Sequence, residues 1–293
     1  MELHIDRLTK SFGAKLAVDR LSATLETGIY CILGPNGSGK TTLLRMIATV
    51  LRQTSGEILL DGKNITDLGA EYRDRLGYMP QKVAYYGHFT PLQYLDYVSA
   101  LKGLDPRQGK RKARELLSLM HLDDVENKKM KTFSGGMLQR IGIAQALLNE
   151  PDILILDEPS SGLDPQERIH LRQIISELGN GRLVFLSTHI VADVEHIAKE
   201  IMIIKKGQLI HQGTTAAMLQ TIENKVWTLR VPTKTNDRQP PGSQVVNTRH
   251  DGAWVEMRLL SDEKPHNDAV LAAPGLEDLY LSCFPEDLSE VRV

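Results

Sequence analysis

Apolar residues follow two different patterns along most of this 293-residue chain. Short, continuous apolar runs at 29–33, 153–156 and 183–186 are typical of parallel strands that are covered on both faces. Segments 43–50 and 138–148 instead place apolar residues at helical spacing. The two patterns together predict an α/β fold built around a mainly parallel sheet.

Further strand patterns lie outside this core. Residues 3–8, 16–25 and 56–60 are typical of strands, and the last of them is followed by an Asp-Gly turn. We therefore expect an antiparallel sheet that flanks the core. A mainly helical pattern predicts a helical insert over about residues 88–135.

The composition changes after about residue 220. Residues 225–231 and 254–259 are typical of strands, and the Pro-Pro-Gly sequence at 240–242 predicts a loop or hairpin connection between them. A short helix is expected after Pro274 and Gly275. The sequence thus predicts a large α/β domain at 1–220 and a small α+β extension at 221–293. Four apolar residues build either the core of this extension or a surface for a partner: Trp227, Trp254, Leu276 and Leu279.

A glycine-rich sequence, Gly-Pro-Asn-Gly-Ser-Gly-Lys-Thr-Thr, occupies positions 34–42 directly after the first apolar run. The glycines allow consecutive amide N–H groups to point at a nucleotide's phosphates, and the following helix adds the positive end of its dipole. Lys40 would reach the outer phosphates, and Thr41 would offer its hydroxyl to Mg²⁺. The segment predicts a P-loop that binds ATP or GTP through Gly34, Asn36, Gly37, Ser38, Gly39, Lys40, Thr41 and Thr42.

Two carboxylates end the second apolar run. Asp157 and Glu158 follow residues 153–156, and doubly wound sheets place their ligands at the C-terminal ends of strands. We expect Asp157 to hold the Mg²⁺ shell and Glu158 to polarise an attacking water. The alternative is that these acids only cap a helix.

A second helix start lies in the sequence Phe-Ser-Gly-Gly-Met at 133–137. Ser134, Gly135 and Gly136 precede the helical pattern of 138–148, so a helix N-terminus is open to an anion. Taken alone, the same residues fit an N-cap with a flexible approach equally well.

These motifs together resemble the ATP-binding subunits of ABC transporters over about residues 2–220. Segment 133–137 is similar to that family's signature motif, although the common form has Leu first and Gln last. The variant resembles the one common in the drug, peptide, sodium and polysaccharide exporter branch. In the family this motif completes the ATP site of a second subunit. The resemblance therefore implies a homo- or heterodimer that holds two ATP molecules between its subunits.

The resemblance also gives roles to residues whose types alone indicate little. Gln81 corresponds to the glutamine that joins Mg²⁺ to the segment touching the membrane partner, and its amide can both donate and accept. His189, which follows the third apolar run and precedes an expected Ile-Val-Ala helix, would bond the γ-phosphate and hold Glu158 and the water in line. Phe12 lies where the family stacks an aromatic ring, usually Tyr, on adenine.

Two more segments match the family by position. Residues 161–164 correspond to the loop between the two active sites, although the same residues are typical of a helix start with Pro in the first turn. Aromatic residues at 89–95 lie where the family docks its membrane partner. These aromatic residues also suit the small core of the insert itself.

Composition limits the partners and the environment. The formal net charge is −2 and the sequence pI is near 6.5, so no general basic surface indicates nucleic acid or anionic lipid. No apolar run approaches the roughly 18 to 20 residues that cross a bilayer, and the N-terminus lacks a signal-peptide pattern. Cys31 and Cys283 are expected to be reduced thiols. Together with these features, the resemblance implies that the protein lies at the cytoplasmic face of the membrane, bound to a separate permease.

The predicted function is hydrolysis of ATP that drives transport, with export favoured by the signature variant and the extension. A soluble ABC-type ATPase of DNA repair or translation is the first alternative. The single nucleotide cassette and the short span from Lys40 to Ser134 argue against it. A regulatory or resistance module that binds ATP without useful turnover is the second alternative. The presence of Asp157, Glu158 and His189 argues against that one.

Overall fold

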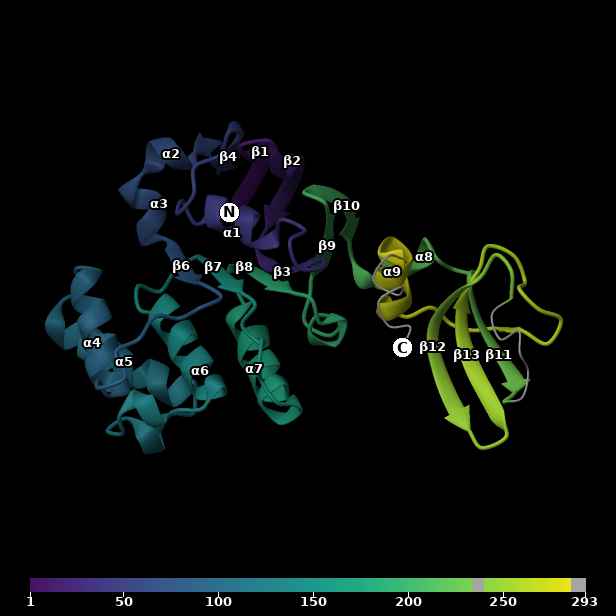
Figure 1. Cartoon of the computed structure of the whole chain (residues 1–293). Coiled ribbons are helices and arrows are strands. Elements are labelled where there is room, and N and C mark those ends of the chain that lie inside the picture. Colours follow the sequence, from purple (N-terminus) through teal and green to yellow (C-terminus); the bar gives the residue numbers. More distant parts are fainter. Residues whose placement is uncertain (234–239, 286–293) are drawn as a thin grey trace. The chain divides into compact units, whose positions relative to one another are not determined.

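The computed structural model describes residues 1–233 and 240–285 of the chain. By its internal contacts the chain divides into two compact units, Met1–Gln212 and Gly213–Val293 (Figure 1). The division lies at the end of strand β10 (Gln208–Gly213), so that helix α8 (Thr215–Gln220) belongs to the second unit.

A six-stranded sheet forms the centre of the first unit, in the order β10-β9-β3-β8-β7-β6. Strands β3, β6, β7, β8 and β9 pair in parallel, which confirms the predicted mainly parallel sheet. Every residue of β7 and β8 is buried, as their continuous apolar sequences require. The bounds of the five strands are Gly28–Leu33 (β3), Leu76–Met79 (β6), Ile153–Asp157 (β7), Leu183–Thr188 (β8) and Glu200–Lys205 (β9).

A second, antiparallel sheet has the order β2-β1-β4-β5, as predicted. One apolar cluster joins it to the first sheet, because residues such as Leu3 and Leu25 share a core with Ile32 and with Leu43 and Leu44 of helix α1 (Lys40–Ile47). Burying one Leu or Ile side chain stabilises a fold by about 1.5–3 kcal/mol, so this shared core holds the two sheets together. The strands are Glu2–Phe12 (β1), Lys15–Glu26 (β2), Ser55–Leu60 (β4) and Lys63–Asn64 (β5).

Helices cover both faces of the parallel sheet. Figure 1 shows α1 and the antiparallel sheet on one side, and α6 and α7 on the other. The predicted helical insert is confirmed by α4 and α5, which pack against each other. A capping box of Thr90 and Gln93 starts α4. The helices are Lys40–Ile47 (α1), Ile65–Leu68 (α2), Ala70–Asp74 (α3), Pro91–Leu101 (α4), Pro106–Leu119 (α5), Gly135–Ala146 (α6) and Pro165–Leu178 (α7).

Two expected helices are shorter in the structure. Helix α1 ends at Ile47, and Val50 is exposed instead of continuing the apolar face. The helix expected after His189 is only the short 3₁₀ turn η3 (Val191–Asp193). β-Branched side chains such as Ile190 and Val191 lose rotamer freedom in a helix, and two of them in a row disfavour an α-helical start.

The second unit contains a four-stranded sheet in the order β12-β13-β11-β14, with a core of Leu229, Val231, Val255, Met257, Leu259 and Ala269. Strands β11 (Val226–Pro232) and β13 (Trp254–Leu260) and helix α9 (Leu276–Cys283) confirm the predicted α+β extension. Strand β12 (Gln244–Asp251) was not expected, since it is a polar, mostly exposed edge strand without apolar alternation. The last strand, β14, is Val270–Leu271.

Cys31 is a buried free thiol, and Cys283 is partly buried. In the two described stretches, no helix is long and apolar enough to cross a membrane.

Candidate active site

The glycine-rich loop joins the end of β3 to the start of α1. Its Gly37 and Gly39 have φ angles of 80° and 113°, which L side chains rarely adopt. A Cβ on Gly39 would lie 2.4 Å from the carbonyl oxygen of Ala17, so the loop also requires glycine for space. Among the described residues, no side chain caps the N-terminus of α1. Its first N–H groups are therefore available to an anion.

Lys40 is the first residue of α1 and is almost completely buried. Its Nζ donates to the carbonyl oxygens of Gly34 at 2.6 Å and Pro35 at 3.2 Å, and it lies 3.5 Å from Oε1 of Glu158. Burial lowers the pKa of Lys40, while the nearby carboxylates of Glu158 and Asp157 act in the opposite direction. The lysine of the loop and the predicted base thus form one buried ion pair.

Asp157 lies at the end of β7 and is fully buried. Its Oδ1 accepts hydrogen bonds from Ser187 Oγ at 2.6 Å and Thr41 Oγ1 at 3.1 Å. Within the described part of the chain, its Oδ2 is buried and has no hydrogen-bond partner. Burial raises the pKa of Asp157, and the two hydroxyl groups oppose that rise. A buried carboxylate with one orphaned oxygen beside a threonine hydroxyl suits a hard divalent cation.

Glu158 follows Asp157 with a φ angle of 52°, in the left-handed region. Its backbone N–H donates to Ser187 Oγ at 2.9 Å, and its Oε2 lies 2.8 Å from Nδ1 of His189. The structure therefore brings Lys40, Glu158 and His189 together, as expected for the predicted phosphate ligand, base and switch residue.

A cleft of about 420 Å³ extends from the loop along this cluster. Phe12 and Gln81 line it, which places two residues that were expected from family position alone at the site. The ring of Phe12 is half exposed, and Nζ of Lys10 lies 5.1 Å from its centroid. The full lining comprises Phe12, Lys15, Ala17, Asn36, Gly37, Gly39, Lys40, Thr41, Thr42, Gln81 and Glu158.

Ser134, Gly135 and Gly136 are not among the residues that line this cleft. Ser134 is the N-cap of α6, and its Oγ accepts from the backbone N–H of Met137 at 3.2 Å. The same hydroxyl donates to Oε1 of Glu167 at 3.4 Å. Ser134 therefore caps α6, and Glu167 contacts the same helix N-terminus, while binding of an anion there stays a prediction.

Three neighbours of the site were missed from the sequence. Ser187 bonds both Asp157 and the backbone of Glu158, Lys15 lines the cleft, and Glu167 contacts Ser134. A Ser-Thr-His sequence at the end of a buried strand could have indicated Ser187. The contacts of Lys15 and Glu167 depend on loop geometry that no local pattern carries.

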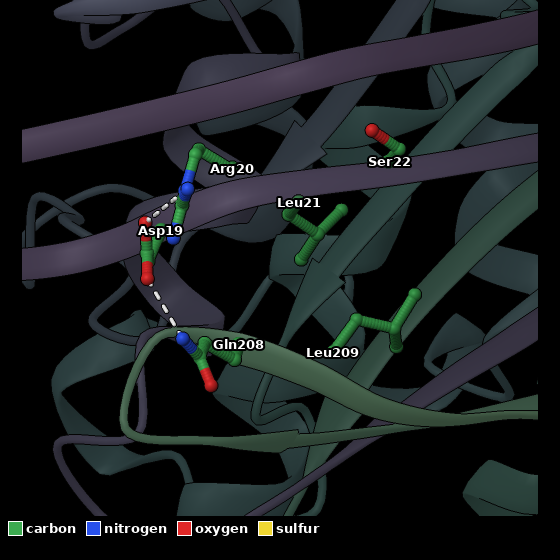
Figure 2. Close-up of a pocket in the computed structure, with 6 residues that line it drawn as sticks. All are labelled: Asp19, Arg20, Leu21, Ser22, Gln208 and Leu209. Atoms are coloured by element: carbon green, nitrogen blue, oxygen red, sulfur yellow. Dashed lines mark hydrogen bonds and ion pairs between the residues drawn. The ribbon is translucent and has the colours of Figure 1, made fainter.

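A second groove, of about 470 Å³, lies between β2 and β10 (Figure 2). Asp19 lines this groove and accepts from Gln208 at 2.7 Å and from Arg20 at 3.1 Å. The hydrogen bond from Gln208 has the largest effect and lowers the pKa of Asp19, and the hydrogen bond from Arg20 lowers it further. The groove contains none of the predicted site residues. Its polar groups tie the edges of two sheets to each other.

The phosphate loop, the two acids at the end of β7 and the histidine after β8 together define a P-loop ATPase. Comparison with known proteins identifies its family. The family described as ABC transporter matches residues 18–161. YxlF, an ABC transporter ATP-binding protein of Bacillus subtilis (strain 168), is 38% identical over 294 residues, 95% of this chain and 98% of that protein. The chain therefore belongs to the ATP-binding proteins of ABC transporters.

Other relatives agree with the predicted likeness to the exporter branch. The Nod factor export ATP-binding protein I of Burkholderia lata is 34% identical over 283 residues, 95% of this chain and 92% of that protein. The linearmycin resistance ATP-binding protein LnrL of Bacillus subtilis is 35% identical over 214 residues, 72% of this chain and 69% of that protein. The resemblance to this branch is thereby confirmed.

Solved structures confirm the fold and the activity. The chain is similar to the ATP-binding subunit of an ABC transporter, with a TM-score of 0.67 and 26% identity over 75% of this chain and 93% of that one. It is also similar to a dimeric ATP-binding cassette in a post-hydrolysis state with ADP and phosphate bound. That likeness has a TM-score of 0.65 and 25% identity over 72% of this chain and 98% of the other. The chain binds ATP and is an ATPase.

Proposed function

We propose that this ATPase drives export through a separate membrane permease, by closing with a second ATP-binding subunit around two ATP molecules. The observation that supports the proposal most is the convergence of Lys40, Glu158 and His189 beside a phosphate loop. A module that only bound ATP would need the loop and the lysine. It would have no need of a carboxylate and an imidazole aligned beside them.

Each of these residues has a distinct task. The backbone N–H groups at the start of α1 hold the phosphates, and Lys40 turns from the carbonyl oxygens of the loop toward the outer phosphates. Glu158 orients and polarises the attacking water. His189, bonded to the same carboxylate, holds the γ-phosphate and the water in line.

Mg²⁺ fits the residues around Asp157. The orphaned Oδ2 of Asp157 and the hydroxyl of Thr41 supply oxygen donors of the kind Mg²⁺ takes, and Gln81 lines the same cleft. When bound there, Mg²⁺ would supply positive charge that neutralises the negative charge developing on the phosphates. In the closed dimer, Ser134, Gly135 and Gly136 would face the nucleotide of the second subunit from the N-terminus of α6.

A surface for the permease is proposed next to Gln81. The aromatic cluster, which we define as Tyr86, His88, Phe89 and Tyr97, has ring centroids 4.8 to 6.1 Å apart. Tyr86 and Tyr97 are 46% and 40% exposed, more than a self-contained core requires. Docking there would bring the chain to the cytoplasmic face of the membrane and connect the permease to the nucleotide through Gln81.

The test is purification of the tagged chain from detergent-solubilised membranes of its own source. We expect a membrane protein of several spans to co-purify, and Tyr97→Ala to lower its recovery by tenfold or more. Leu101→Ala is a matched control, because Leu101 is 69% exposed on the same helix α4 but lies outside the aromatic cluster. An active ATPase that retains no membrane protein, or that is equally affected by both variants, would contradict the proposed coupling.

A further inference from the structure

A buried hydrogen bond lies behind the proposed base. Ser160 Oγ donates to Oδ2 of Asp193 at 2.6 Å, and the two residues are 5% and 3% exposed. Ser160 lies in the turn after Glu158, and Asp193 is the last residue of η3, just beyond His189. The bond thus joins the two segments that carry the base and the histidine.

We propose that Ser160 and Asp193 are positioning residues that hold the backbone turn of Glu158, and that they act on hydrolysis through Glu158. The proposal rests on the role proposed above for Glu158 as the base. Neither residue lines the cleft, so neither contributes to nucleotide binding directly.

The backbone of Glu158 needs such support. Its φ angle of 52° is a left-handed conformation that a non-glycine residue keeps only where its surroundings hold it. Before the turn, Ser187 accepts the N–H of Glu158 through Oγ at 2.9 Å. After the turn, Glu158 O accepts from the N–H of Ser161 at 3.2 Å, and the side chain of Ser160 is fixed by Asp193. The bond to Asp193 therefore anchors the downstream half of the turn.

The two contacts between these segments differ in their exposure to water. The His189 side chain is 44% exposed, so water competes for its bond to Glu158. The bond between Ser160 and Asp193 has a charged acceptor and is shielded from solvent, which strengthens it. A buried carboxylate is costly unless it is hydrogen-bonded, so the pair is an obligatory contact. It keeps the segments that carry Glu158 and His189 at the same relative position when the bond between those two side chains breaks.

The segment that carries Asp193 is itself fixed. Arg172 of α7 donates from Nη1 to the carbonyl oxygen of Ala192 at 2.7 Å. Burial raises the pKa of the Cys31 thiol, and the charge of Asp193 raises it further, which is consistent with a carboxylate packed close to β3. These contacts therefore resist a displacement of Asp193. Because Asp193 is fixed, its hydrogen bond fixes Ser160, and Ser160 in turn fixes the backbone turn of Glu158.

The test compares ATP hydrolysis and ATP affinity in variants of the full chain with its partners. Ser160→Ala should lower kcat by about tenfold or more, because small misplacements of a positioned base are costly. The Kd of a fluorescent ATP analogue should stay within about twofold of the parental value. Ser160→Thr, which keeps the hydroxyl, should restore most of the rate. Glu195→Gln is the control, since Glu195 is an exposed acid two residues beyond Asp193.

The decisive step repeats Ser160→Ala in a Glu158→Gln background. If Ser160 acts through Glu158, the second substitution lowers the residual rate no further. A further tenfold loss there, a parental rate for Ser160→Ala alone, or a parallel loss of ATP affinity would each overturn the proposal. Asp193→Asn keeps the shape of the pair and provides the same comparison should Ser160→Ala not fold. An unchanged rate for Glu158→Gln itself would contradict the role of Glu158 as the base, on which this proposal rests, whereas the outcomes above contradict only the positioning role of Ser160.

Discussion

Nδ1 of His189 lies 2.8 Å from one carboxylate oxygen of Glu158, and Nζ of Lys40 lies 3.5 Å from the other. A single, almost fully buried carboxylate therefore joins the phosphate loop at the start of α1 to the histidine after β8. Any change to the charge of Glu158 acts on both neighbours.

Glu158→Gln keeps the shape of the side chain and removes its basicity. We expect turnover to fall by about 10²- to 10⁴-fold, the usual contribution of a positioned base. ATP affinity should persist, because the loop and Lys40 remain, and dimers should accumulate in ATP. Steady-state hydrolysis and sedimentation in ATP measure the two effects. Hydrolysis at the parental rate with saturating partner would show that Glu158 is not the base.

The sequence predicted those parts of the site that are continuous along the chain. The loop at 34–42 and the acids after β7 are local, since each depends on one strand end and the residues that follow it. Contacts such as Ser187 with Asp157 join segments thirty residues apart, and a local sequence such as Ser-Thr-His can indicate a polar strand end but not the partner of each side chain. The polar edge strand β12 was missed for another reason. Most of its side chains are exposed, so its sequence lacks the alternation of apolar residues that indicates a strand.

The second prediction concerns the outward face of α6. An added Cβ at Gly135 would meet nothing within 4 Å, whereas one at Gly136 would lie 1.7 Å from Oε2 of Glu167. Gly135→Leu should therefore leave the single chain folded and obstruct only a second subunit. We expect tenfold or greater loss of ATPase activity with unchanged ATP affinity in the isolated chain.

Lys40→Ala is the reference for the Gly135 experiment, because Lys40 belongs to the half of the site within the chain. It should weaken ATP binding in the monomer. A loss of monomer affinity in Gly135→Leu as large as that in Lys40→Ala would argue against a site shared between subunits.

The third prediction concerns the orphaned oxygen of Asp157. Asp157→Asn keeps an acceptor toward Ser187 and Thr41 but removes the negative charge offered to Mg²⁺. ATP affinity measured in EDTA should change little, while the increase in affinity on adding Mg²⁺ should be largely lost. Titration of ATP at fixed Mg²⁺ concentrations checks this. An unchanged increase in ATP affinity on adding Mg²⁺ would show that Asp157 is not a ligand of the proposed metal site.

The last prediction concerns the second unit. All residues that line the cleft precede residue 159, so a truncation after Gly213, which keeps β10 intact, should leave ATP affinity within about twofold of the parental value.

Of the four apolar residues first considered, Leu276 and Leu279 are buried, which favours a core role for them. Trp254, Val270 and Leu271 are 43%, 67% and 47% exposed and leave apolar surface for a partner. We therefore expect the truncated Glu158→Gln protein to form fewer dimers in ATP than the full-length variant. Sedimentation of both at equal concentration tests this, and equal dimer fractions would leave the extension without a role in dimerisation.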